Sequence, residues 1–180
     1  MLQRYEKKCN FARPIHGLTH PAAVLPVTPR KTYSESELLA KAERYCAREE
    51  QCVSAVRRKL QEWGAAPACA NAIVRHLLEE RFIDERRYVR LYCQGKLRIQ
   101  RWGRNKMVWE LRGKGIADDL IAEGLDSLSD DEYRTVLDKV AQAKWDTLRD
   151  SDEYIRRRKL TAYLISRGFT MEEVNTLSGK

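Results

Sequence analysis

Apolar residues recur along most of the chain three or four positions apart, which is the spacing of α-helices. The first such run follows Ser34 and Glu37, a serine and a glutamate at the separation of a helix-initiating capping box. Three successive runs fit three helices before residue 81, and Pro67 suits the first turn of the third. The sequence has no sustained alternation of apolar and polar residues and no Asn-Gly or Asp-Gly hairpin. The pattern therefore predicts an all-α protein.

The central stretch opens at Asp84, whose carboxylate can accept from the free amides of a first helical turn. Tyr88, Leu91, Tyr92 and Gly95 follow at i, i+3, i+4 and i+7. This spacing predicts that they form the inward face of the helix, with Gly95 allowing another helix to approach closely. A second short helix follows, with three inward apolar residues and a glycine at its end (Met107, Val108 and Leu111; Gly113 or Gly115).

This plan recurs along the chain. A leucine followed four positions later by a glycine closes the expected second helix of each unit, at shifts of 51 and 53 positions (Leu60 and Gly64, Leu111 and Gly115, Leu164 and Gly168). Pairs of residues with the spacing of a capping box recur as well, at Ser129 with Glu132 and at Thr170 with Glu173, and predict further helix starts. We therefore predict an elongated tandem array of three three-helix repeats, at residues 34–81, 82–128 and 129–180.

Residues 1–33 break the helical pattern. They hold four of the five prolines, and we expect a flexible, basic N-terminal extension there. Cys9, His16 and His20 lie in this segment and are ligand types for zinc. No fourth ligand accompanies them, so we expect no bound metal.

Charge is segregated along the sequence, although the whole chain carries a net +8 with a pI near 9.3. Residues 84–114 hold ten Lys/Arg against three acids, a net +7, whereas residues 115–150 hold four against ten, a net −6. Arg87, Arg90, Arg98 and Arg101 fall on one helical side and predict a basic stripe facing nucleic acid or an acidic protein. Alternatively, these arginines only solubilise the helix or pair with the acidic segment.

The central stretch resembles the signature of RecX, the bacterial regulator of the RecA recombinase. The matching segments are FIDERRYV at residues 82–89 and GRNKMVWELRGKGI at residues 103–116, and a weaker likeness extends from Leu38 to Leu177. Gly113 departs mildly from the family pattern. The resemblance implies a non-enzymatic cytoplasmic protein, monomeric and without a cofactor, that binds the RecA nucleoprotein filament.

On this resemblance, binding would inhibit filament growth, ATP hydrolysis and strand exchange in DNA repair, recombination and the SOS response. Weak non-specific contact with DNA would accompany it. We expect the partner-binding residues among the central cations (Arg86, Arg87, Arg90, Arg98, Arg101, Arg104, Lys106 and Lys114).

The sequence lacks the motifs of several other classes. There is no GxxxxGK[ST] loop for a nucleotide phosphate, no apolar run long enough to span a membrane and no secretory signal. Asp118 with Asp119 and Asp130 with Asp131 stand where helices are expected to begin, so the helix dipole accounts for them. An odd number of cysteines without a CxxC pair fits reduced thiols.

Two other functions stay open at this stage. One is a DNA-binding regulator in which paired helices act as helix-turn-helix units. The other is a thiol-dependent enzyme using Cys93, whose basic neighbours in sequence favour a lowered pKa. Trp102 and Trp109 lie among the same cations and could stack on bases, although we expect them to pack within the protein.

Overall fold

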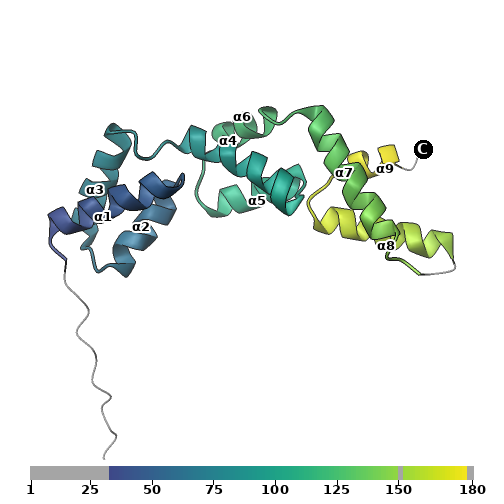
Figure 1. Ribbon diagram of the computed structural model, residues 1–180, viewed down its shortest axis with the longest axis horizontal. Helices are drawn as coiled ribbons and strands as arrows, with labels where there is room; N and C mark the ends of the chain where they lie inside the picture. Colours follow the sequence, from purple (N-terminus) through teal and green to yellow (C-terminus); the bar gives the residue numbers. More distant parts are fainter. Residues whose placement is uncertain (1–32, 150–151, 178–180) are drawn as a thin grey trace, which may run out of the picture. The chain divides into compact units, whose positions relative to one another are not determined.

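The computed structural model describes residues 33–149 and 152–177. Over these residues the chain forms helices joined by short turns, with no β-strand (Figure 1). The elements are α1 (Glu35–Arg48), α2 (Val53–Glu62), α3 (Pro67–Glu79), α4 (Glu85–Gly95), the π-helical turn η1 (Lys96–Gln100), α5 (Arg104–Gly113), α6 (Asp118–Asp126), α7 (Asp130–Trp145), α8 (Glu153–Ser166) and α9 (Met171–Leu177). The prediction of an all-α array of three-helix units is confirmed.

Side-chain caps start the first helix of each unit. Ser34 and Glu37 form the reciprocal capping box at α1, and Asp84 accepts from the amide of Arg87 at 2.9 Å to start α4. Ser129 accepts from the amide of Glu132 at 3.4 Å at the start of α7. Because such caps satisfy amides that a helix leaves free, they fix where each unit begins.

The three repeated glycines end the second helix of each unit. Gly64, Gly115 and Gly168 have φ of 84°, 77° and 95°, the left-handed conformation that glycine adopts without strain. Gly113, the alternative end of α5, is instead its last helical residue. The recurrence seen in the sequence therefore reflects one repeated turn.

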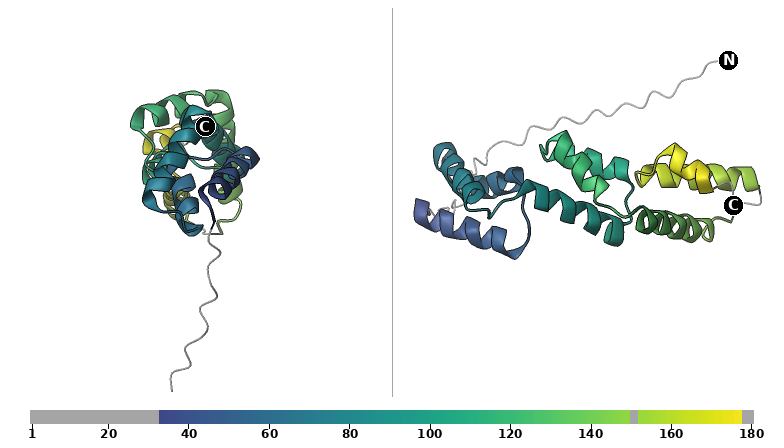
Figure 2. Two further views of the ribbon diagram at one scale, coloured as in Figure 1. Left: turned by 90° about the vertical axis from the view of Figure 1, so that its left-hand side faces the viewer. Right: turned by 90° about the horizontal axis from the view of Figure 1, so that it is seen from above.

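Buried side chains form two clusters. The first lies within α1–α3 and the turn before α4, and it includes Leu38, Val56, Leu60 and Leu77. The second runs through α4–α9 without a break, so the central and third units share one core. Within it α4 packs on α6, α7 on α8 and α8 on α9 (Figure 2).

The inward face of α4 differs from the prediction. Val89 and Cys93 are fully buried, whereas Leu91 is 48% exposed. Tyr88 and Tyr92 are partly buried and pack against the second core cluster, as predicted. The close approach is not at Gly95 either, since a Cβ there would meet nothing within 4 Å. It is at Gly124 of α6, where a Cβ would lie 2.4 Å from Cγ1 of Val89.

The predicted N-terminal extension falls almost wholly outside the described residues, as do Cys9, His16 and His20. Tyr33, its last residue, packs against the first core cluster. The elongated shape and the repeat boundaries at 81, 128 and 180 stay predictions. None of the described helices has both the length and the apolarity needed to cross a bilayer.

Candidate partner-binding surface

All eight candidate cations belong to the central unit. Arg86, Arg87 and Arg90 lie on α4, and Arg98 lies on η1. Arg101 follows η1, and the remaining three lie on α5 or just after it (Arg104, Lys106 and Lys114). The helix ends before Arg101, so the predicted stripe does not continue along one helical face.

Four of these arginines are paired within the chain. The partners of Arg86, Arg87 and Arg98 stand 34 to 37 positions away, and those of Arg104 stand 26 and 69 positions away. The N–O distances range from 2.5 to 3.3 Å (Arg86 to Glu123, Arg87 to Glu50, Arg98 to Glu132, and Arg104 to Asp130 and Glu173). Within the predicted stripe, Arg87 and Arg98 are thus neutralised by acids that lie far away in the sequence.

The Arg98 pair shows how these contacts are built. Its Nε and Nη2 donate to the two carboxylate oxygens of Glu132 at 2.6 and 3.0 Å. These hydrogen bonds hold the pKa of Glu132 below its usual value. Glu123, Asp130 and Glu132 all come from the acidic segment 115–150. Of the stripe, the alternative of pairing with that segment therefore describes Arg98, and Arg86 and Arg104 outside the stripe pair with it as well.

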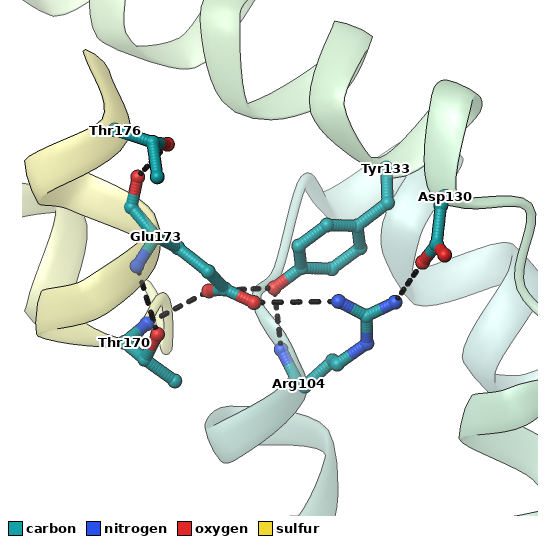
Figure 3. A network of polar contacts seen from close by, with 6 residues as sticks. All are labelled: Arg104, Asp130, Tyr133, Thr170, Glu173 and Thr176. Atoms are coloured by element: carbon teal, nitrogen blue, oxygen red, sulfur yellow. Dashed lines mark hydrogen bonds and ion pairs between the residues drawn. The ribbon is translucent and has the colours of Figure 1, made fainter. Parts of the chain in front are cut away.

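Arg104 belongs to a polar network that joins the central and third units (Figure 3). Its guanidinium stacks 4.0 Å over the ring of Tyr133 and donates to Asp130 and Glu173. The Tyr133 hydroxyl accepts from the Arg104 amide at 3.0 Å and donates to Glu173 at 3.2 Å. Burial raises the pKa of Tyr133, so the hydroxyl stays protonated at neutral pH. The structure thus gives Arg104 a structural role.

Backbone contacts also connect the central and third units, at a junction that we call the Gly103 joint. The amide of Gly103 donates to the carbonyl of Arg167 at 2.9 Å, and that of Asn105 donates to the carbonyl of Gly168 at 3.0 Å. A Cβ at Gly103 would lie 2.3 Å from the backbone of Gly168. The central and third units are therefore held in contact through main-chain atoms.

The remaining candidates have free charges. Within the described residues, Arg90, Arg101 and Lys114 take part in no ion pair, and both arginines are exposed. Lys106 has no carboxylate partner there, and its ammonium lies 4.6 Å from the centre of the Trp102 ring. These four are the cations of the set that a partner can engage without first breaking an internal ion pair.

The two tryptophans behave differently. Trp102 packs against the core, as expected, with the ammonium groups of Lys96 and Lys106 over its ring. Trp109 is 73% exposed on α5, so the expectation that it packs inside is wrong. It lines a pocket of about 330 Å³ together with Arg58 and Lys114. Exposed aromatic rings beside cations are typical of binding surfaces, so Trp109 stays a candidate for the base stacking considered from the sequence.

The thiol chemistry considered for Cys93 is not supported. The side chain is fully buried, and burial raises its pKa to about 11. The expected lowering of this pKa is therefore wrong, and the thiol stays protonated at neutral pH. In the ranges 33–149 and 152–177 no group of three or more His, Cys, Asp or Glu is placed to hold a metal ion.

Comparison with known proteins now assigns this architecture. Two family models match, described as RecX, second three-helix domain, over residues 84–125, and RecX, third three-helix domain, over residues 130–177. The regulatory protein RecX of Pelodictyon phaeoclathratiforme is 30% identical over 123 residues, which cover 67% of this chain and 74% of that relative. The chain belongs to the RecX family. All eight candidate cations lie within its second RecX domain.

Other RecX proteins show how far the likeness extends. The regulatory protein RecX of Clostridium tetani is 32% identical over 110 residues, or 60% of this chain and 50% of that protein. The chain spans between a half and three fifths of the first such relatives. A crystal structure of regulatory protein RecX has the same fold, with a TM-score of 0.72 at 21% identity over 81% of this chain and 74% of that one. The relatives are regulatory proteins, and regulation is the coarse function that the family carries.

Proposed function

We propose that this protein binds the RecA–DNA filament and restrains its growth, its ATP hydrolysis and strand exchange. The match of two consecutive RecX domains supports this proposal, and the second RecX domain is the one that holds the free cations. The setting would be the cytoplasm, in the control of DNA repair, recombination and the SOS response. The protein would act as a monomer without a cofactor.

Charge supports this partner. A RecA filament offers phosphates and acidic side chains along its length, and free cations attract both. Arg90 and Arg101 are exposed and unpaired, whereas Arg86, Arg87 and Arg98 must first give up a carboxylate. We therefore assign the first contact to the unpaired cations, with the paired arginines as secondary candidates and Arg104 as part of the joint.

The test is inhibition of ATP hydrolysis by RecA on single-stranded DNA, with wild type and an Arg90→Glu variant. The reversal of one unpaired surface charge should weaken inhibition several-fold while helicity stays unchanged, because rim charges mainly set association rate and salt dependence. Arg75→Glu is the matched control, since Arg75 is exposed on α3 and lies outside the candidate set.

Two results would contradict the proposal. If wild type leaves RecA activity unchanged at all concentrations, the filament is not its target. If wild type instead retards one DNA sequence selectively in a gel shift without RecA, the helix-turn-helix regulator is the better assignment. Equal loss in Arg75→Glu and Arg90→Glu would refute only the assigned contact, because net charge alone would then explain the effect.

A further inference from the structure

A basic pocket lies where η1 ends against the third unit. It has a volume of about 340 Å³ and is lined by seven residues (Arg101, Val140, Ala143, Lys144, Thr147, Tyr163 and Arg167). We call it the Arg101 pocket. Three of the lining residues lie on α7 (Val140, Ala143 and Lys144), and Thr147 follows the end of that helix by two positions. Tyr163 lies on α8, and Arg167 directly follows it.

The lining of the Arg101 pocket has positive charge and no acid. Arg101, Lys144 and Arg167 are its three cations, and no Asp or Glu is among the seven residues. Four other surface pockets of the described chain each include at least one Asp or Glu. Positive charge that no carboxylate compensates, gathered in a concave site, points to an anionic ligand.

The cations of the pocket are held in place by neutral contacts. The Arg167 guanidinium donates to the carbonyl oxygens of Gln100 and Arg101, which fixes it beside the turn without using a carboxylate. The Lys144 ammonium lies 5.1 Å from the centre of the Tyr163 ring. A cation held by a carbonyl or an aromatic ring keeps its full charge for a ligand, because neither partner neutralises it.

Arg101 itself has a left-handed backbone, with φ of 54°. Glycine would suit this position better, since a side chain at positive φ costs conformational energy. Arg81 shares the conformation, so strain alone does not mark a site. The positive φ does make Arg101→Gly a suitable variant. Glycine removes the guanidinium and adopts this backbone conformation without strain, so the fold should be kept.

We propose that the Arg101 pocket binds a phosphate of a single-stranded nucleic-acid backbone. Arginine and lysine are the usual phosphate ligands, and the pocket supplies both types. Its exposed cation Arg101 would hold a lone anion weakly, but a strand brings adjacent phosphates to further cations, of which Arg149 follows Thr147 by two positions. This inference rests on the proposed function, because it names the group of the RecA–DNA filament that this face would contact.

The experiment measures binding of a fluorescent single-stranded oligothymidylate to the full chain without RecA, across a range of salt concentrations. Arg101→Gly and Lys144→Gln should each lower the slope of log affinity against log salt by about 0.7, the value for one lost phosphate contact on a single strand. Each should weaken binding at low salt about two- to fivefold, as expected for an exposed ion pair. Arg75→Gln, which removes an exposed charge on α3, should leave the slope unchanged.

Competitors identify the source of the anion. Excess inorganic phosphate should compete weakly, and polyglutamate should compete less well than unlabelled oligothymidylate at equal charge. If inorganic phosphate displaces the strand as well as the oligonucleotide does, or if polyglutamate does, the assignment to a nucleic-acid backbone is overturned. Unchanged slopes in both pocket variants, with circular dichroism showing intact helices, would equally overturn it.

Because RecA is absent from this measurement, its outcome is separate from that of the proposed function. If wild type inhibits RecA but the pocket variants bind the oligonucleotide as wild type does, the phosphate site is refuted and the proposed function stands. If the variants lose oligonucleotide binding as expected but wild type has no effect on RecA, the phosphate site stands and the proposed function is refuted.

Discussion

The contact between Gly103 and Gly168 provides a direct test of how the central and third units are joined. A Cβ at Gly103 would lie 2.3 Å from both the carbonyl carbon and oxygen of Gly168, and 2.4 Å from the amide nitrogen of Phe169. These are backbone atoms, so no rotamer change relieves the clash. Alanine suits the φ of −78° and ψ of 165° at this position, and any cost of Gly103→Ala therefore comes from forcing the two segments apart.

The magnitude follows from what the separation breaks. Two backbone hydrogen bonds cross the contact, at 2.9 and 3.0 Å, and each contributes about 1 kcal/mol net. Forcing an extra methyl group into a packed site typically costs a further 1–3 kcal/mol or so. We expect Gly103→Ala to lower the free energy of unfolding by about 3–5 kcal/mol, a large fraction of the stability of a small protein.

Urea unfolding followed by circular dichroism measures this loss, and hydrogen exchange at the Asn105 amide locates it. Gly95→Ala is the matched control: it lies in the same unit, a Cβ there meets nothing within 4 Å, and its φ of −64° is helical. The control should be stabilised by about 0.5–1 kcal/mol, the usual gain of alanine over glycine in a helix. A Gly103→Ala protein as stable as wild type, with Asn105 still protected, would show that the two segments are not in tight contact.

Three further predictions concern shape, surface and pH. Small-angle scattering should show an elongated monomer, and a compact particle would contradict this. Deletion of residues 1–33 should leave the thermal midpoint of unfolding nearly unchanged, and a large drop in that midpoint would show that the segment packs on the first unit. Trp109→Ala should change stability by less than about 0.5 kcal/mol, because the side chain is 73% exposed, yet weaken inhibition of RecA; an unchanged inhibition curve would exclude Trp109 from the interface. Burial raises the pKa of Cys93 from 9.0 to about 11, so its contribution to stability is present below pH 9 and is lost as the pH rises through 11. Urea midpoints should therefore fall less steeply over this range in Cys93→Ala than in wild type, and parallel slopes would refute this.

Helix boundaries could be predicted from the sequence because their chemistry is local. Ser34 and Glu37 stand three residues apart, and a cap needs nothing beyond that span. Likewise Gly64 and Gly115 end their helices through backbone freedom that belongs to the residue itself. These features give the element order without any tertiary information.

The buried face of α4 could not be predicted in the same way. Apolar residues occupy two neighbouring rows of this helix, one with Tyr88 and Leu91 and the other with Val89 and Cys93. Periodicity fits both rows, and burial depends on which one meets α6. Gly124 decides this, because the missing side chain leaves room for Val89.

The ion pairs could not be predicted from neighbouring residues either, because their two partners are far apart in the sequence. Arg87 and Glu50 are 37 positions apart, and Arg98 and Glu132 are 34 apart. The charge segregation between residues 84–114 and 115–150 indicated pairing of the kind that Arg98 makes, but it does not say which arginine takes which acid and gives no sign of Glu50. The unpaired cations, which matter most for binding a partner, could therefore be identified only from the structure.

The joint at Gly103 also bears on how the chain folds during synthesis. The first amides of α5 are satisfied by the Tyr133 hydroxyl and the Gly168 carbonyl, not by a cap of its own. During synthesis α5 leaves the ribosome before Tyr133 and Gly168 do. The first amides of α5 therefore lack these hydrogen-bond partners until the third unit has emerged. The central unit is thus not an autonomous module: its last step of folding waits for its successor.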